Sequence, residues 1–465
     1  MSLKSPKLDV IVIGAGLSGL QAAHDVQKAG LSCVVLEARD RVGGKTWSLP
    51  CANGKGVVDA GAAWINDTNQ SKMFALTKRF GLETITQRTE GNCLAHDVGA
   101  FPYGGIPPFL GDDGENMRQV RDKIEELCQK IDLRKPALEN YDTMNFEEFV
   151  RHLGGKEVAF QTARVWTKAM LGCEPSEMSA LWFLDYCKSG GGLMQTRSDM
   201  KHGGQYLRIK KGTQSFSKGL AAALHPGSVL LNTPVTNIQQ TPGDCTVITK
   251  SGSVFYSKKV ILSVPTPLYK DITFTPPLSG AKLALTNSTT LGCTSKMILC
   301  YEKPWWRSQN LSGMTQSFRG PYTITRDTSN DSAGHYSLTS MPGADAARAW
   351  GKLPAHERRA QILAQVVEIF GNAEEAYRPI EIFEMEWSKE EFSKGCPCPV
   401  MPPNALSNWG HALREPFGDV HFVGTETAYE WKGYMEGAVR SGERGAEEVV
   451  LALGKLAASG ISAKL

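Results

Sequence analysis

The sequence has no long apolar segment. No uncharged apolar run reaches the roughly 18 residues that a membrane span requires, and the N-terminal stretch MSLKSPKLDV has no apolar signal-peptide core. The 11 cysteines are an odd number scattered from Cys33 to Cys398, which is not the spaced, even set of a disulfide framework. These absences predict an intracellular, mostly reduced protein without a membrane span.

An excess of charge of one sign is also lacking. The 51 lysines and arginines nearly balance the 48 aspartates and glutamates, so the net charge is +3. That balance offers no attraction for nucleic acid or an anionic membrane, and we expect neither as a partner. The 41% apolar content is that of a globular protein, and 465 residues favour two or three domains of roughly 150 residues each.

What the chain does contain is a glycine fingerprint near its N-terminus. An apolar run from Val10 to Ile13 stops at GAGLSG, a helical pattern follows, and a second apolar run ends at Glu37. In such a βαβ unit Gly14 makes the tight turn, Gly16 lets the backbone approach a pyrophosphate, and Gly19 lets the helix pack on the strand. Glu37 stands where a carboxylate can accept hydrogen bonds from ribose hydroxyls. This spacing predicts a dinucleotide-binding unit.

Two further signatures follow in order. Residues 38–46 form a basic, glycine-rich loop that could lie along a diphosphate, and residues 57–65 form a short strand that runs into a glycine turn. Near the C-terminus an apolar strand, 420–423, leads into GTET and then GYMEGA, which offers backbone N–H groups and a helix N-terminus to a polar ligand. With these signatures the sequence resembles the flavin-containing amine oxidase family, most closely its soluble, fungal-type monoamine oxidases.

The resemblance implies an FAD site built from both ends of the chain. Lys45 stands where the family usually has an arginine, so a bidentate contact becomes a point-charge contact. For Val235 and Trp387, the alternative to cofactor binding is an ordinary position in the core. The expected cofactor-binding residues are Gly14, Gly16, Gly19, Glu37, Arg39, Arg41, Gly43, Gly44, Lys45, Ala63, Trp64, Val235, Trp387, Cys396, Gly424, Thr425, Glu426, Gly433, Tyr434 and Met435.

Cys396 lies in a Lys-Gly-Cys-Pro segment similar to the one by which animal monoamine oxidases bind FAD covalently. The resemblance implies a thioether between this cysteine and the 8α-methyl group of the flavin. The alternatives are a buried free thiol and the non-covalent FAD of many relatives, and Cys398 is the less favoured attachment site. No histidine or further cysteine lies at ligand spacing from this pair, so no metal site is expected.

The family also implies roles at the substrate side. Lys296, on an apolar strand face, would contact flavin N5 through water and assist the reaction with oxygen, although a lysine there can also snorkel to an edge. Tyr434 would form one wall of the aromatic pair that frames the substrate amine, and Pro397 replaces the other wall. Gln205 and Leu171 are expected to line the same pocket.

The expected fold class is α/β, with a Rossmann-like FAD-binding domain and an inserted α+β substrate domain. The FAD domain would comprise residues 1–79, 204–287 and 388–455, and the substrate domain residues 80–203 and 288–387, before a tail at 456–465. Within them we expect helices at 116–131, 146–150 and 216–224, a loop at 104–113, and a small sheet from runs at 229–231, 235–238, 245–248, 253–256 and 259–264.

The implied reaction is oxidation of an amine to an imine, then an aldehyde plus ammonia or amine, with O2 reduced to H2O2. The absence of a Ser-His-Asp order, an HExxH motif and a P-loop fits a flavin that carries the chemistry. The expected partners are a small-molecule amine and O2, and the chain could form a homodimer. Alternatives are an L-amino-acid or polyamine oxidase on the same fold, a flavin-bearing binding scaffold, and an NAD(P)H-dependent reductase, for which a second GxGxxG is missing.

The last three residues, Ala463-Lys464-Leu465, resemble the peroxisomal Ser-Lys-Leu address. We therefore expect a peroxisomal protein, with a cytoplasmic one as the alternative.

Overall fold

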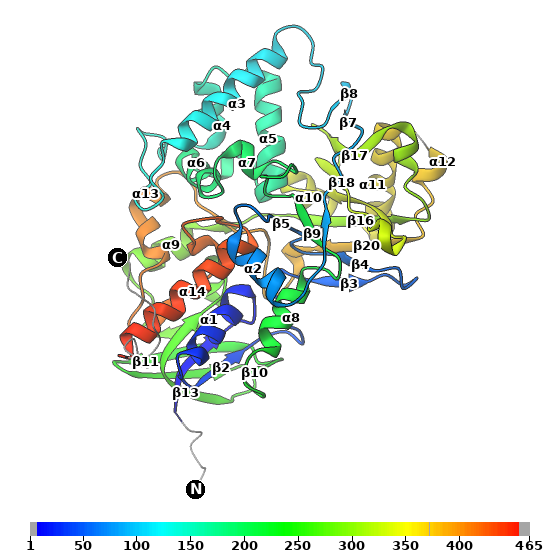
Figure 1. The fold of residues 1–465 in the computed structure, drawn as a ribbon. Coiled ribbons are helices and arrows are strands. Elements are labelled where there is room, and N and C mark those ends of the chain that lie inside the picture. The colour runs from blue at the N-terminus through cyan, green and yellow to red at the C-terminus, as the bar shows by residue number, and fades with distance from the viewer. Residues whose placement is uncertain (1–6, 372, 455–465) are drawn as a thin grey trace.

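The computed structural model describes residues 7–371 and 373–454 (Figure 1). The predicted βαβ unit consists of β1 (Leu8–Ile13), α1 (Leu17–Lys28) and β2 (Cys33–Leu36), and β1 pairs with β2 in parallel. Both strands are buried along their apolar runs, as expected for parallel strands that are covered on both faces. The N-terminal fingerprint therefore has the strand, turn, helix and strand that it requires.

The first sheet unites strands from three distant parts of the chain. Its order is β10-β2-β1-β13-β12-β11-β14, and β22 pairs with β13. The added strands are β10 (Val229–Leu230), β11 (Val235–Thr241), β12 (Asp244–Thr249), β13 (Val254–Leu262), β14 (Thr273–Thr275) and β22 (Val420–Phe422).

Two expectations for this region were wrong. The runs at 229–264 do not form a small sheet of their own, because β13 pairs in parallel with β1 over Leu8 to Ile13. The runs at 253–256 and 259–264 form one continuous strand, because Ser257, between them, is fully buried and pairs with Leu8. Serine is common in turns, but Ser257 occupies an interior position of a strand.

Helices cover this first sheet. The last helix, α14 (Met435–Ala452), runs beside α1, and a Cβ built at Gly442 would lie 2.3 Å from the carbonyl oxygen of Ser18 (Figure 1). The two helices therefore approach at backbone distance, which only a glycine permits. Further helices of this half are α2 (Ser71–Arg79), α8 (Gln214–Ala222) and α9 (Gly280–Ser288).

The second half contains another sheet, of order β20-β16-β19-β18-β17-β7-β8. Its strands are β7 (Asn92–Ala95), β8 (Gly99–Pro102), β16 (Ser295–Tyr301), β17 (Leu311–Gln316), β18 (Ile324–Asp327), β19 (Tyr336–Met341) and β20 (Glu381–Glu386). The hairpin β7–β8 was not among the predicted elements.

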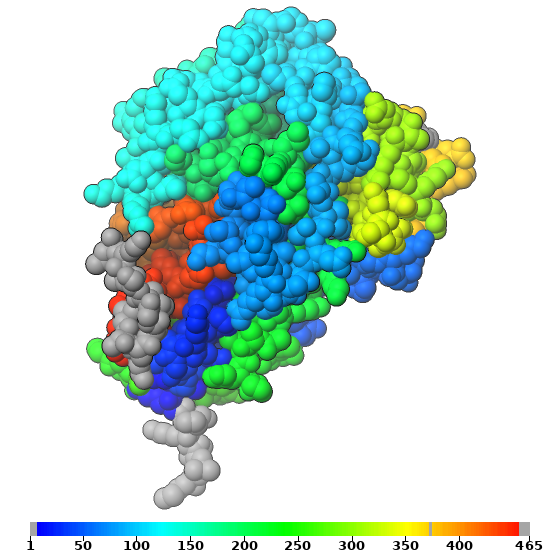
Figure 2. All heavy atoms as spheres, viewed as in Figure 1, coloured from blue at the N-terminus to red at the C-terminus, as the bar shows by residue number. Residues whose placement is uncertain are grey.

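A helical group, the cyan and green helices at the top of Figures 1 and 2, adjoins this second sheet. Its helices are α3 (Asp113–Gln129), α4 (Phe146–His152), α5 (Glu157–Leu171), α6 (Ala180–Ser189) and α7 (Leu193–Thr196). A shared core of buried residues, including Phe146, Phe149 and Trp182, holds the group together. The two helices predicted in this half are present, and the loop predicted at 104–113 ends at 112 because α3 begins at Asp113. With the second sheet beside these helices, this half is α+β as expected.

The remaining elements are short or peripheral. They are β3 (Ser48–Pro50), β4 (Val57–Asp59), β5 (Trp64–Ile65), β6 (Thr84–Thr86), β9 (Leu207–Ile209), β15 (Thr290–Leu291), β21 (Pro399–Val400), α10 (Ala344–Trp350), α11 (Ala355–Phe370), α12 (Ala373–Ala376) and α13 (Ala405–Trp409). Among the described residues no helix has the length and apolar character to cross a membrane. The eleven cysteines, all in the described ranges, are free.

Candidate functional site

One large cavity, of about 680 Å³, lies where the two halves meet. Most of the residues expected at the site line it: Gly14, Gly16, Glu37, Arg39, Gly43, Gly44, Lys45, Ala63, Trp64, Gln205, Val235, Lys296, Trp387, Cys396, Pro397, Gly424, Thr425, Glu426, Gly433, Tyr434 and Met435. Gly19, Arg41 and Leu171 do not line it. Its volume is in the range of sites that enclose a ligand.

The three fingerprint glycines differ in their surroundings. Gly14 has φ +99°, and a Cβ there would lie 2.7 Å from the carbonyl oxygen of Ser263. A Cβ at Gly19 would lie 2.0 Å from the Gly14 carbonyl oxygen, so this residue packs the helix against the turn. At Gly16 no atom lies within 4 Å of the built Cβ, and no side chain caps α1. The open N–H groups of this helix end suit a pyrophosphate.

Glu37 closes the same end of the cavity. Its carboxylate is buried and accepts hydrogen bonds from the backbone N–H of Ala15, at 2.6 Å, and of Arg39, at 2.9 Å. Each carboxylate oxygen keeps a second lone pair. The group is therefore held in place and still able to accept from ribose hydroxyls.

The basic loop lies against the start of α1. The N–H of Gly43 donates to the Ala15 carbonyl at 2.8 Å. Lys45 reaches across the cavity and donates from Nζ to the Pro397 carbonyl at 3.0 Å, and burial lowers its pKa. Arg41 points away: its guanidinium lies 4.3 Å from the ring centre of Trp47, and it supports the loop by donating to Gly44.

A second helix end borders the cavity at its C-terminal segments. Tyr434 is the residue before α14, and no side chain caps this helix. Gly424, with φ +147°, brings the backbone close to Glu426, whose carboxylate accepts from the N–H of Thr266 at 3.0 Å. Burial raises the pKa of Glu426. The cavity thus receives the positive ends of two helices, an arrangement that favours an anionic ligand such as a diphosphate.

Lys296, on β16, is held in place by two backbone carbonyls of the segment 59–61. Its Nζ donates to the carbonyls of Asp59, at 3.1 Å, and Gly61, at 2.5 Å, and lies 5.3 Å from the ring centre of Trp64. Burial lowers the pKa of Lys296 to about 8, against the opposing charge of Asp59. Because an ammonium has three donors, one N–H remains for a partner in the cavity. The lysine does not snorkel to an edge, since it is only 8% exposed.

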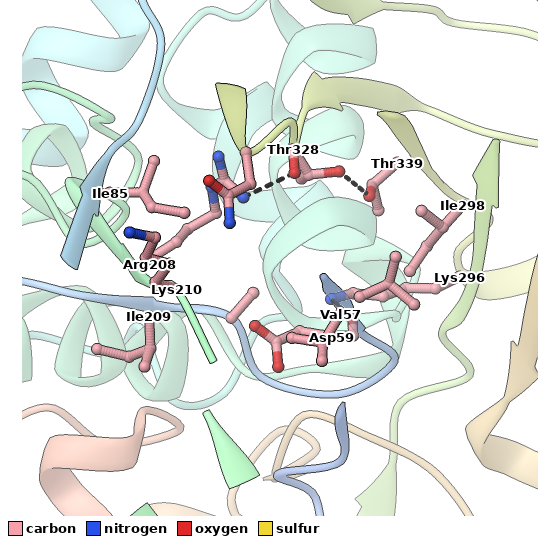
Figure 3. Close-up of a pocket in the computed structure, with 13 residues that line it drawn as sticks. Val57, Asp59, Ile85, Arg208, Ile209, Lys210, Lys296, Ile298, Thr328 and Thr339 are labelled. Carbon is pink, nitrogen blue, oxygen red and sulfur yellow. Dashed lines mark hydrogen bonds between the residues drawn. The ribbon is translucent and has the colours of Figure 1, made fainter. Parts of the chain in front are cut away.

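A small second cavity of about 20 Å³ lies behind Lys296 (Figure 3). Figure 3 shows Asp59, Arg208, Thr328 and Thr339 around it, with Arg208 donating to the Thr328 carbonyl at 2.7 Å. The volume is enough for about one water molecule. Lys296 lines both cavities and so forms the wall between them.

The two candidate cysteines have different surroundings. Cys396 lines the cavity and packs beside Trp387, whose indole N–H donates to the Ala60 carbonyl at 3.0 Å. Burial raises the pKa of the Cys396 thiol to about 11, against the opposing effect of nearby Lys45. Cys398 is 0% exposed and belongs to the core of the helical group. Only Cys396 has access to a ligand in the cavity.

Tyr434 and Gln205 meet at one carbonyl. The phenol of Tyr434 donates to Thr196 O at 3.0 Å, and Gln205 Nε2 donates to the same atom at 2.9 Å. The amide oxygen of Gln205 is buried and has no partner among the described residues. Beside Tyr434 lies the stacked ring of Tyr186, 6.3 Å away between centroids, which also lines the cavity and which the sequence had not indicated.

The far part of the cavity, which we call the substrate end, is lined mainly by the second half of the chain. Met170 lines it, whereas its neighbour Leu171 is buried in the helical core. Besides Thr294, Lys296 and Trp387, the lining residues from this half are Val165, Trp166, Ala169, Met170, Tyr186, Thr196, Arg197, Met314, Gln316, Ile324, Arg326 and Met341. Eight of these residues follow the helical period of α5 or the alternation of β17 and β18, but neither pattern says which face meets a cavity.

The residues present fit FAD. Two open helix ends and a basic loop suit its diphosphate, a fixed carboxylate suits its ribose, and the unpaired oxygen of Gln205 and the free N–H of Lys296 remain for polar groups at the other end.

Comparison with known proteins agrees with this geometry. A family model described as flavin containing amine oxidoreductase matches residues 17–450. The flavin-containing amine oxidase B of Canis lupus familiaris is 33% identical over 461 residues, covering 97% of this chain and 88% of that protein. The flavin-containing amine oxidase of Danio rerio is 35% identical over 462 residues, with the same coverage.

Solved structures are similar along nearly the whole chain. A putrescine oxidase variant from a redesign of cofactor binding has a TM-score of 0.89 and 29% identity, covering 96% of this chain and all of that one (100%). Cyclohexylamine oxidase from Brevibacterium oxydans has a TM-score of 0.90 and 27% identity over 97% of this chain and 100% of that chain. On these matches and this site, the chain belongs to the flavin-containing amine oxidoreductase family.

Proposed function

We propose that this FAD-dependent amine oxidase converts a small-molecule amine to an imine and passes the electrons to O2, releasing H2O2. The observation that carries the proposal is the single cavity in which the glycine fingerprint meets Lys296, Cys396 and Tyr434. Bound FAD would supply the redox chemistry, taking up a hydride equivalent from the carbon next to the amine nitrogen, and the imine would then hydrolyse to an aldehyde.

The chain's own residues would position the amine and exclude water. Tyr434 and Gln205 are held through Thr196 and present a ring face and an unpaired amide oxygen. The cationic Lys296 disfavours an ammonium close by, so the site selects the unprotonated amine that oxidation requires. Lys296 would also hold a water, or the developing charge on oxygen, with its remaining N–H.

We further propose that Cys396 attaches to the flavin 8α carbon as a thioether. Formation of this bond would release one proton each from the thiol and the methyl group, and O2 would accept the two electrons. The exposure of Cys396 to the cavity supports this, and the burial of Cys398 makes it the control. Acid precipitation of the wild type and Cys398→Ser should give a yellow pellet, whereas Cys396→Ser should release its colour. A colourless wild-type pellet contradicts the bond.

Peroxide release from a panel of amines, without added nucleotide, tests the oxidase activity. The panel should include alkyl and aryl amines, diamines and L-amino acids, because an L-amino-acid or polyamine oxidase is the alternative on this fold. Turnover that requires NADH or NADPH would favour a reductase. No turnover of any member would leave the binding-scaffold alternative.

Three further expectations stay proposals. The FAD domain comprises residues 1–79, 204–287 and 388–455 and the substrate domain 80–203 and 288–387; limited proteolysis should cut near these boundaries. A homodimer should be seen by light scattering. The terminal Ala463-Lys464-Leu465 lies outside the described residues, and we propose it as a peroxisomal address. A fluorescent protein that carries residues 456–465 should enter peroxisomes, and removal of these three residues should leave it in the cytoplasm.

A further inference from the structure

Two arginines line the substrate end, and the proposed reaction uses neither. Arg326 lies on β18, where alternation places it on the same side as Ile324, and both line the cavity. The residue is 8% exposed. Its Nε donates to both carboxylate oxygens of Asp199, at 3.1 Å each. Its two Nη groups are not enclosed by protein and have no hydrogen-bond partner among the described residues.

Asp199 acts as a support for Arg326. Its carboxylate also accepts a hydrogen bond from the hydroxyl of Tyr103, and the residue is buried outside the cavity lining. The aspartate therefore fixes one edge of the guanidinium and leaves the Nη edge turned to the cavity. A donor edge that is held in place and unpaired is suited to a ligand oxyanion.

Arg197 adds a second cation at this end. Its guanidinium lies 4.5 Å from the ring centre of Trp166 and has no hydrogen-bonded side-chain partner in the described part of the chain. Burial, with repulsion from Arg121 and Arg326, lowers the pKa of Arg197 to about 10, so it is still charged at neutral pH. Arg326 is thus ion-paired with Asp199, whereas no ion pair is present for Arg197 among the described residues.

Carboxylates are absent from the described lining of the substrate end. The acids that line the cavity, Glu37, Asp271, Glu391 and Glu426, all lie in segments of the cofactor half. A substrate with a second ammonium, such as a polyamine, would meet arginine charge there without an acid to pair with. A substrate that carries an anion would meet two free donor edges.

Resting on the proposed amine oxidation, we infer that the substrate carries a carboxylate besides its amine, and that Arg326, with Arg197, binds it. The planar guanidinium matches a carboxylate with two parallel hydrogen bonds. Arg326 and Lys296 flank the same ring, with Arg326 Cζ 5.4 Å and Lys296 Nζ 5.3 Å from the centre of Trp64. The carboxylate subsite is therefore inside the cavity, beside the residue proposed for oxygen chemistry.

The test compares aminohexanoate, hexylamine and diaminohexane, which share a chain and differ at the far end, together with L-phenylalanine and phenylethylamine for a carboxylate next to the amine. In the wild type a carboxylated member should have the higher kcat/KM of its set. Arg326→Gln should lower that value about 10- to 100-fold, mainly through KM, and change the uncharged amine by less than about 3-fold. Arg197→Gln should act in the same direction.

The matched control is Arg319→Gln, because Arg319 is exposed and pairs with Asp97 and Glu368 outside the cavity. If Arg326→Gln fails to fold with Asp199 unpaired, the double variant with Asp199→Asn removes both charges. Equal turnover of carboxylated and uncharged amines, or a preference that survives both arginine variants, overturns the inference. If no amine yields peroxide, the oxidase proposal is overturned instead. The carboxylate subsite would still be identified if hexanoate quenches tryptophan fluorescence in the wild type but not in Arg326→Gln.

Discussion

Replacement of Lys296 by methionine should slow the reaction of the reduced enzyme with oxygen. Methionine fills a similar volume but removes the ammonium that Asp59 and Gly61 hold in the wall of the cavity. A unit charge about 5 Å from the reacting oxygen contributes about 3 kcal/mol at an effective dielectric constant of about 20. The reoxidation rate should therefore fall about 100-fold, since each 1.4 kcal/mol corresponds to about a factor of ten.

The same lysine predicts a pH dependence. Because burial lowers its pKa to about 8, the ammonium is present below that pH and lost above it. Its charged fraction falls from about nine-tenths at pH 7 to about one-tenth at pH 9, so wild-type reoxidation should slow about tenfold across this window. The Lys296→Met rate should not change with pH in the same range.

Stopped-flow mixing of the anaerobically reduced enzyme with oxygenated buffer, from pH 6 to pH 10, measures both effects. Lys282→Met is the matched control, because Lys282 is also buried, with a pKa lowered to about 7, but lies outside the cavity. An unchanged rate in Lys296→Met, or the same pH profile in both variants, would refute the charge argument.

Four other variants test separate parts of the structure. Gly16→Val should weaken FAD binding in a fluorescence titration without lowering the stability of the apoprotein. Gly19→Ala should lower the free energy of unfolding in urea by about 2 kcal/mol, because the added Cβ would meet the backbone. Asp185→Ala should cost about 3–5 kcal/mol, since it leaves the buried Lys432 ammonium without its ion pair. Pro397→Tyr should raise kcat/KM for aryl amines about 2- to 10-fold over hexylamine by restoring a ring opposite Tyr434.

Each of these has a result that contradicts it. Equal effects of Gly16→Val and Gly19→Ala on stability would mean that the open space at Gly16 is not the cofactor site. The double variant of Asp185→Leu with Lys432→Met should recover most of the lost stability, and a failure to recover it would argue against the ion pair as the cause. An aryl-amine preference that Pro397→Tyr leaves unchanged would mean that the second ring is not what limits these substrates.

The parts of the site that depend on local spacing could be predicted from the sequence. Gly14, Gly16 and Gly19 lie within six residues of one another, whereas the role of Lys296 follows only from the family resemblance. Arg326 could not be found in this way, because its role depends on the contact with Asp199, 127 residues earlier, and on which face of β18 meets the cavity.

The wrong and missing predictions about the fold have the same origin. Ser257 resembles a turn residue until β1, some 250 positions earlier, is laid beside it. The strands of the hairpin β7–β8 are only 4 residues each, too short for a clear alternation. Leu171 and Met170 are neighbours on α5, and only the packing of the helical group decides that the first enters the core and the second the cavity.

The order of assembly of the first sheet has a consequence for biosynthesis. The fingerprint leaves the ribosome before β13, which pairs with β1, before β22, which pairs with β13, and before α14, which covers α1; all three are made hundreds of residues later. Such remote pairing is slow to form, and the early strands stay unpaired at an edge while the inserted half is translated. Cofactor capture therefore comes late in folding, because the C-terminal residues that line the cavity, such as Gly424 and Tyr434, are made last.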